Sequence, residues 1–149
     1  MELTPDWVVG FVDGEGCFHV SLQKHPEMTV GYQVLPEFVV VQHERDMPVL
    51  YALKRFFRCG VVRRNHGDRY AFRIRKLEDL KRVCEFFTTH PLKTKKNVDF
   101  QKFRRVLHLM GEKRHLEREG LVQIIDIAMT MNTASRPMLE KIRRELEVG

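Results

Sequence analysis

Residues 8–16 read VVGFVDGEG, and this stretch decides how the rest of the sequence is interpreted. Gly10 and Gly14 are four residues apart, so they share one face of a helix. Because glycine has no Cβ atom, this face lets a second backbone approach closely. A self-complementary patch of this kind suits a two-fold dimer, and we therefore predict that Gly10, Asp13 and Gly14 lie at a dimer interface.

The predicted helix covers residues 3–12, with Thr4 as its N-cap, and its end is marked by Gly14 and Gly16. Acids at a helix C-terminus oppose the helix dipole and cost about 0.3–1 kcal/mol each, which favours a functional reason for Asp13 and Glu15. Mg²⁺ prefers carboxylate, carbonyl and phosphate oxygens, so we predict a metal site from Glu15 and the Gly14 carbonyl. The alternative is a glycine-rich helix end with two surface acids.

Length and composition favour one domain that handles nucleic acid. The chain has 149 residues, 43% of them hydrophobic, and a formal net charge of +6. It contains no apolar run of the ~20 residues that cross a bilayer, and residues 1–5 do not resemble a signal or transit peptide. Three cysteines without CxxC spacing argue against a disulfide framework and a cysteine-based zinc site. We expect an intracellular domain spanning residues 1–149, with its core at about 3–132 and a charged helix within 133–149.

The positive charge is concentrated in two segments. Residues 61–76 hold six basic residues against one aspartate, and so do residues 93–105. In the first segment Tyr70, Phe72 and Ile74 alternate with arginines, which indicates a strand with one apolar and one basic face. With His66, Gly67 and Asp68 as its turn, this segment predicts a basic β-hairpin of a shape that fits the major groove.

The remaining patterns predict an α+β fold in the order α-β-β-α-β-β-α, followed by further helices. Its four strands would form one antiparallel sheet, with helices on the apolar face and the other face open. Pro36 in the second strand indicates a bulge or a locally unpaired edge, and Asp46 is the expected N-cap of the second helix. The strands are expected at 17–24, 32–42 and in the hairpin, and the later helices at 47–57, 77–89, 95–115, 119–131 and 135–148. The helix at 95–115 is either broken at Gly111 or extends past it.

The nonamer at 8–16, the element order, Gln42 at the end of the second strand and PLKTKK at 91–96 together resemble the LAGLIDADG homing endonuclease family. The resemblance covers residues ~5–132. Because the motif occurs once, it is similar to members that work as homodimers. Glu15 replaces the second aspartate of the family motif.

The resemblance implies a catalytic set of Glu15, Gln42, Lys95 and Asp13. Gln42 would help to position water near the scissile phosphate, and Lys95 would stabilise developing charge there, with Lys93 and Lys96 as rivals. Asp13 would contribute mainly to the helix end. Mg²⁺ would be the cofactor, with Mn²⁺ as an equivalent and Ca²⁺ as a non-catalytic substitute.

The open face of the sheet is expected to bind double-stranded DNA. Arginine suits guanine, glutamine and asparagine suit adenine, and glutamate suits cytosine. Lysines of the second basic segment would instead contact phosphates. The residues expected on the DNA face are His19, Ser21, Gln23, Gln33, Glu37, Arg63, Asn65, Arg69 and Arg73.

The resemblance thus implies a homodimeric endonuclease that cuts both strands of a long pseudo-palindromic site across the minor groove and promotes intron mobility. It would act where the host genome lies, in a bacterial or archaeal cytoplasm or an organelle. Two alternatives stay open. One is an intron RNA maturase or a non-cleaving DNA-binding regulator with the same fold, and the other is a small structural or ribosome-associated RNA-binding domain.

Overall fold

The structure is a computed structural model that describes residues 1–132 and 135–148. Residues 133, 134 and 149, which belong to the expected C-terminal helical segment, lie outside the described residues. The chain divides into two compact units. Unit 1 consists of Met1–Phe18 and Glu37–Phe100, and unit 2 of His19–Pro36 and the described part of Gln101–Gly149.

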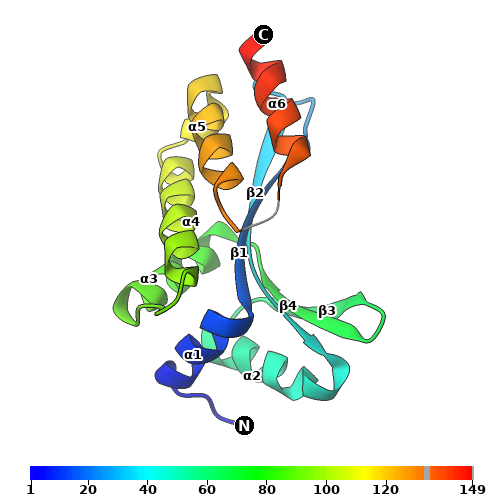
Figure 1. Ribbon diagram of the computed structural model, residues 1–149, viewed down its shortest axis with the longest axis vertical. Helices are drawn as coiled ribbons and strands as arrows, with labels where there is room; N and C mark the ends of the chain where they lie inside the picture. Colours follow the sequence, from blue (N-terminus) through cyan, green and yellow to red (C-terminus); the bar gives the residue numbers. More distant parts are fainter. Residues whose placement is uncertain (133–134, 149) are drawn as a thin grey trace. The chain divides into compact units, whose positions relative to one another are not determined.

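Helices and strands follow one another in the predicted α-β-β-α-β-β-α order (Figure 1). Their bounds are α1 Pro5–Glu15, β1 Gly16–Lys24, β2 Tyr32–His43, α2 Met47–Phe57, β3 Val61–His66, β4 Arg69–Ile74, α3 Leu77–Thr89, α4 Lys96–Gly111, α5 Arg118–Met129 and α6 Pro137–Val148, with short 3-10 turns at Glu44–Asp46 and Arg114–Leu116.

The strands form one four-stranded sheet in the order β1-β2-β4-β3, which confirms the predicted α+β class with an antiparallel sheet. β2 pairs with β4 from Phe38 opposite Ile74 to His43 opposite Arg69. Pro36 is part of the continuous strand β2 but precedes the first residue paired with β4. A residue without a backbone N–H is tolerated there because β4 does not require its donor.

Phenylalanines fill the core of unit 1. On the helix-covered face of the sheet, Phe38 packs against Phe57 of α2 and Phe87 of α3, with ring centroids 5.9 and 6.0 Å apart. Phe18, at the start of β1, packs against Phe38 and against Phe100 of α4 at 5.2 and 5.4 Å. Except for Phe57, which is 8% exposed, these rings are at most 1% exposed. The cluster fixes the end of α1 relative to β2 and β4, because β1 begins directly after α1.

One local prediction was wrong in detail. Asp46 occupies the N-cap position of α2 but makes no capping hydrogen bond with its side chain. The preceding 3-10 turn is capped instead by His43, whose Nδ1 accepts a hydrogen bond from the Arg45 N–H at 3.1 Å. The long basic helix expected over 95–115 ends at Gly111, which is the break that the sequence had left open.

In unit 2, α5 and α6 pack against each other, the first residue of β2 is hydrogen-bonded to α6, and the middle of β1 is hydrogen-bonded to the residue before α6. The Tyr32 hydroxyl donates to the Glu145 carboxylate at 2.5 Å, and this bond raises the pKa of Tyr32. Arg136 donates to the Val20 carbonyl at 2.9 Å. These bonds join the second half of the sequence to the strands that carry His19, Ser21 and Gln33.

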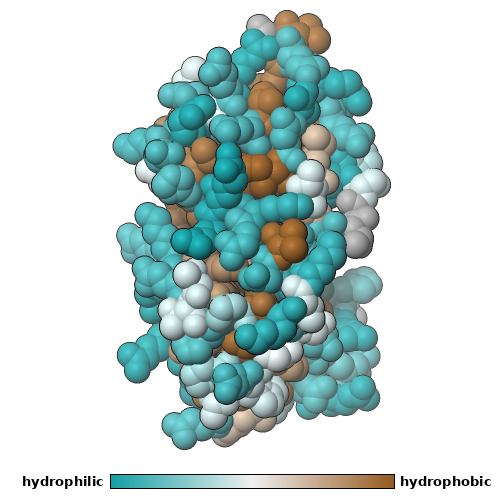
Figure 2. All heavy atoms as spheres, turned by 60° about the vertical axis from the view of Figure 1, so that its left-hand side comes forward, coloured by the Kyte–Doolittle hydropathy of each residue, from teal (hydrophilic) through white to brown (hydrophobic). Residues whose placement is uncertain are grey.

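Charged and polar side chains cover most of the molecular face drawn in Figure 2, and hydrophobic atoms show as scattered patches between them. None of the helices in the described ranges is both long and apolar enough to span a bilayer.

Candidate functional site

The C-terminal end of α1 runs directly into β1 at Gly16. Val8, Val9 and Val12 bury one side of the helix, and the Gly16 N–H donates to the Val12 carbonyl. A Cβ atom on Gly16 would lie 2.7 Å from Val12 Cγ1, so only glycine fits between helix and strand. This tight connection leaves Glu15 exposed at the helix end, where its carboxylate makes no hydrogen bond or ion pair with the described residues.

Asp13 is two residues from Glu15, but its carboxylate is fully engaged. Its Oδ2 accepts a hydrogen bond from the Lys93 N–H at 2.7 Å. Its Oδ1 accepts from the Thr94 N–H at 3.2 Å and from the Thr94 hydroxyl at 2.8 Å. Asp13 therefore holds the PLKTKK segment against the end of α1. This position agrees with the packing role expected for Asp13 and gives that role three named contacts.

Lys96, rather than Lys95, reaches the end of α1. The Lys96 ammonium donates to the Gly16 carbonyl, one residue after Glu15. The Lys96 N–H also donates to the Thr94 hydroxyl at 3.2 Å, which links this lysine to the segment held by Asp13. Lys95 is 63% exposed, with its ammonium 3.9 Å from the Asp99 carboxylate. The sequence had named Lys96 only as a rival of Lys95.

Gln42 lies near the end of β2, opposite Tyr70 of β4. The following residues fix this strand end: His43 Nε2 is 2.9 Å from Asp68 Oδ2, and the Glu44 N–H donates to the Asp68 carbonyl at 2.7 Å. The structure thus places Gln42 at the expected strand terminus. Among the described residues, no hydrogen bond joins it to Asp13, Glu15 or Lys96.

One face of α1 remains uncovered by the rest of unit 1. Trp7 is 43% exposed, and its ring stacks on the half-buried ring of Phe11 at 4.8 Å. Gly10 and Gly14 lie on the same face, because all four residues follow helical spacing. A Cβ atom on either glycine would meet nothing within 4 Å. The packing of this chain therefore does not explain why these two positions are glycine.

In unit 1, the expected DNA-face residues lie on the sheet face opposite the phenylalanine core. Arg73 is opposite Val39 and Val61, on the other side from Phe72. Glu37 pairs with Arg73 at 2.6 Å and with Arg75 at 2.7 Å. Arg75, which follows the last residue of β4, was not among the predicted DNA-face residues, although it continues the alternation of Arg69 and Arg73.

In unit 2, strand alternation separates the remaining predicted DNA-face residues from the buried side chains. In β1, His19, Ser21 and Gln23 alternate with buried Val20 and Leu22. In β2, Gln33 lies between buried Tyr32 and Val34. The strand pattern is as predicted, and the assignment of these residues to DNA contact stays a prediction.

A basic cavity of about 480 Å³ lies in unit 1, near the start of β3 and the end of β4. Burial raises the pKa of the Cys59 thiol there, and the charge of Asp79 adds to this effect. The thiol is thus less prone to ionise than an ordinary cysteine. The lining residues are Arg58, Cys59, Gly60, Val61, Arg73, Arg75, Lys76 and Asp79.

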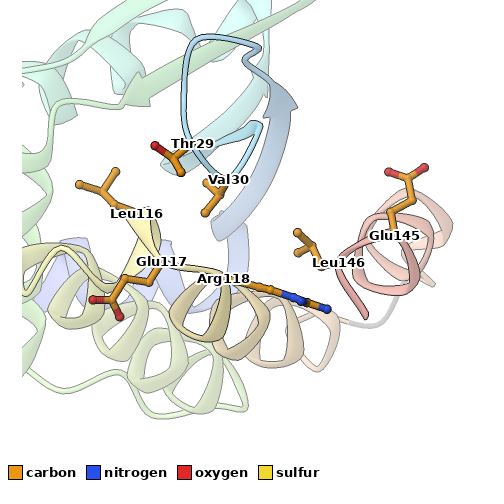
Figure 3. A pocket seen from close by; sticks show the side chains of 7 residues that line it. All are labelled: Thr29, Val30, Leu116, Glu117, Arg118, Glu145 and Leu146. Atoms are coloured by element: carbon orange, nitrogen blue, oxygen red, sulfur yellow. The ribbon is translucent and has the colours of Figure 1, made fainter. Parts of the chain in front are cut away.

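A second cavity, of about 300 Å³, lies in unit 2 and contains none of the predicted site residues (Figure 3). Its labelled side chains come from the loop before β2, from the turn before α5, from the first residue of α5 and from α6. Across residues 1–132 and 135–148, no three His, Cys, Asp or Glu side chains gather closely enough to hold a metal ion.

An exposed carboxylate and a bound lysine at the end of α1, together with a sheet face rich in arginine, define a candidate site for acting on a polyanion. Residues 8–107 match the model of the LAGLIDADG endonuclease family. The chain belongs to this family. A curated relative, probable intron-encoded endonuclease 3 of Neurospora crassa, is 32% identical over 131 residues, which is 85% of this chain.

Solved structures show the same fold. The crystal structure of the homing endonuclease I-TnaI is 61% identical, with a TM-score of 0.96 over 98% of this chain and 99% of that one. I-SmaMI bound to uncleaved DNA in the presence of calcium ions is 33% identical, with a TM-score of 0.90 over 94% of this chain. This chain spans 48% of I-SmaMI and 24% of the Neurospora protein.

We predict effects of different size on stability for the two acids of the motif, Asp13 and Glu15. Replacing Asp13 by Asn leaves one amide oxygen for donors that now use two carboxylate oxygens, and should lower the free energy of unfolding by about 1–2 kcal/mol. Glu15→Gln is the matched control, because it changes charge identically but breaks no hydrogen bond, and it should stay within about 0.5 kcal/mol of the unmodified protein. Urea denaturation measures both; equal losses would contradict the assignment.

Proposed function

We propose that this chain is one subunit of a homodimeric, site-specific double-stranded DNA endonuclease that promotes intron mobility. The observation that carries the proposal is the arrangement at the end of α1. The Glu15 carboxylate makes no hydrogen bond or ion pair with the described residues, and the carbonyl of the next residue, Gly16, accepts a hydrogen bond from the Lys96 ammonium. Family membership and the solved structures of similar endonucleases with DNA support it. We propose further that residues 1–149 work as a single domain within the compartment that holds the host genome.

A divalent cation fits this site. Glu15 offers a free carboxylate, and the last carbonyls of α1 carry the partial negative charge of a helix C-terminus. Mg²⁺ is typically held by one or two carboxylates, water and substrate phosphate, so one carboxylate per subunit is a suitable contribution. We assign Glu15 and the Gly14 carbonyl as ligands, with Mn²⁺ as an equivalent and Ca²⁺ as a non-catalytic substitute. When bound, the cation would supply Lewis acidity toward water and phosphate.

The other residues divide the remaining work. Lys96 takes the role expected for Lys95, because its ammonium lies beside the residue that follows Glu15. A fixed positive charge there stabilises the additional negative charge of the phosphate in the transition state. Asp13 positions this lysine through Thr94 and does not touch the reacting atoms. Gln42 would orient the attacking water from the end of β2.

The second subunit is proposed to pack on the uncovered face of α1. Gly10 and Gly14 leave space that no described residue fills, and Trp7 and Phe11 expose apolar area on the same face. This chain spans about half of I-SmaMI and nearly all of I-TnaI. A two-fold dimer through α1 would bring two Glu15 carboxylates together, which suits cutting two strands across a minor groove only ~6 Å wide.

Glu15→Gln tests the cutting activity. It keeps the size of the side chain but removes the negative charge needed for a hard cation, so cleavage should fall by about 10²-fold or more while DNA affinity is nearly kept. The measurement is cleavage of a plasmid library of random inserts with Mg²⁺ or with EDTA, together with filter binding. Lost affinity with unchanged cutting would overturn the role of Glu15.

The two adjacent lysines provide a separate test. Lys96→Ala should lower the cleavage rate by about 10²-fold, because it removes the charge next to the proposed reacting phosphate. Lys95→Ala removes the same charge one residue earlier and should lower the rate by about threefold at most. Single-turnover cleavage of the selected target measures both. A larger loss for Lys95→Ala than for Lys96→Ala would show that Lys95, as the sequence had suggested, stabilises the charge at the phosphate.

The dimer is tested at the glycines of α1. Gly10→Ala or Gly14→Ala adds a methyl group where the partner helix is proposed to lie, and should weaken the dimer by about 1–3 kcal/mol without unfolding the chain. Gly111→Ala is the matched control, since it also adds a methyl group into open space on a helix. Sedimentation equilibrium gives the dissociation constants. A wild-type protein that stays monomeric alone and on DNA would refute this part of the proposal.

A further inference from the structure

Glu37 lies on the open face of the sheet but is mostly withdrawn from solvent, with its side chain 16% exposed. Each carboxylate oxygen binds a different arginine: Oε1 accepts from Arg73 Nη1 at 2.6 Å, and Oε2 accepts from Arg75 Nε at 2.7 Å. The Arg73 side chain is 26% exposed, whereas that of Arg75 is 69% exposed. Both oxygens of Glu37 are therefore already committed to donors of its own chain.

A second contact fixes Arg73 from the hairpin. Arg73 Nη2 donates to the Asn65 Oδ1 at 2.6 Å. Asn65 lies where the register of β3 against β4 shifts, between Arg64 and His66. Such an irregularity re-aims side chains, and here it accompanies the approach of Asn65 to Arg73. The guanidinium is thus held at both terminal nitrogens, from β2 by Glu37 and from β3 by Asn65.

Holding the guanidinium at two points leaves it able to bind a base. Arginine has five N–H donors, so two internal bonds leave three. Two of these can serve the O6 and N7 atoms of a guanine, the commonest specific arginine contact in the major groove. Because the side chain is already ordered, it loses less conformational entropy on binding than a free arginine does. Arg63 and Arg69, on the same face, have no such ion pair among the described residues.

We propose that Glu37 and Asn65 are positioning residues that fix Arg73 to read one guanine in each half of the DNA site. Glu37 then sets specificity through Arg73 and contacts no base itself. This differs from the cytosine contact that its residue type had suggested. This inference rests on the proposed DNA-binding function and concerns how that function selects sequence.

The test is binding selection from a randomised duplex DNA library, followed by sequencing. Arg73→Lys keeps the charge but loses the two-point contact, so the preference for guanine at one position of each half-site should fall about 5- to 150-fold. Glu37→Gln should relax the same position, and adding it to Arg73→Lys should change the preference no further. Glu44→Gln is the control, because this exposed acid loses the same charge and pairs with no arginine among the residues that the structure describes.

Several outcomes would overturn the inference. If Glu37→Gln relaxes a different position, at which the wild-type protein prefers cytosine, then Glu37 reads a base itself. If Glu44→Gln gives the same change as Glu37→Gln, the effect is one of net charge. The inference is also refuted if the wild-type protein selects a sequence but Arg73→Lys loses no guanine preference at any position. The proposed function survives that outcome. A wild-type protein that binds no duplex at all refutes the proposed function.

Discussion

The hydrogen bonds that the Asp13 carboxylate accepts from Lys93 and Thr94 hold the site together. They join α1 to a segment that lies 80 residues later in the sequence, so the position of this segment depends on a long-range contact. The Thr94 hydroxyl accepts a hydrogen bond from the Lys96 N–H, and the Lys96 ammonium donates to the carbonyl of Gly16, the residue after Glu15. The two acids of the motif therefore differ: the Asp13 carboxylate accepts hydrogen bonds from its own chain, whereas the Glu15 carboxylate is proposed to bind a cation.

Local features were predictable because neighbouring residues produce them. Thr4 accepts from the Trp7 N–H as its position indicates, and the turn at Gly67 has the positive φ of 57° that such a hairpin needs. Which of the two lysines, Lys95 or Lys96, lies beside the end of α1 was not predictable. Their placement depends on where α4 begins and on the hydrogen bonds that hold Lys93 and Thr94 to distant Asp13, and the PLKTKK segment carries no signal of either. A feature is thus predictable when its cause lies within a few positions of its effect.

The glycines of the motif have different causes, although the sequence presents them alike. Gly16 is required by packing inside the chain, since a Cβ atom there would collide with Val12. Gly10 and Gly14 stand in open space, and helical glycine costs about 1 kcal/mol relative to alanine. The lower helix stability caused by these two glycines is explained if they allow a stabilising contact with another molecule. Close approach of a second helix is the form of recovery that suits missing Cβ atoms.

The contacts of Glu37 give a physical reason why the proposed DNA-binding face can carry an acid. Its negative charge offsets part of the charge of Arg73 and Arg75, and this lowers the attraction to any phosphate backbone. Non-specific affinity depends on that attraction, whereas a guanine contact depends on the placement of the guanidinium. An acid that weakens the attraction to phosphates while it fixes the guanidinium raises the ratio of specific to non-specific binding. A rare site in a large genome is found only when that ratio is high.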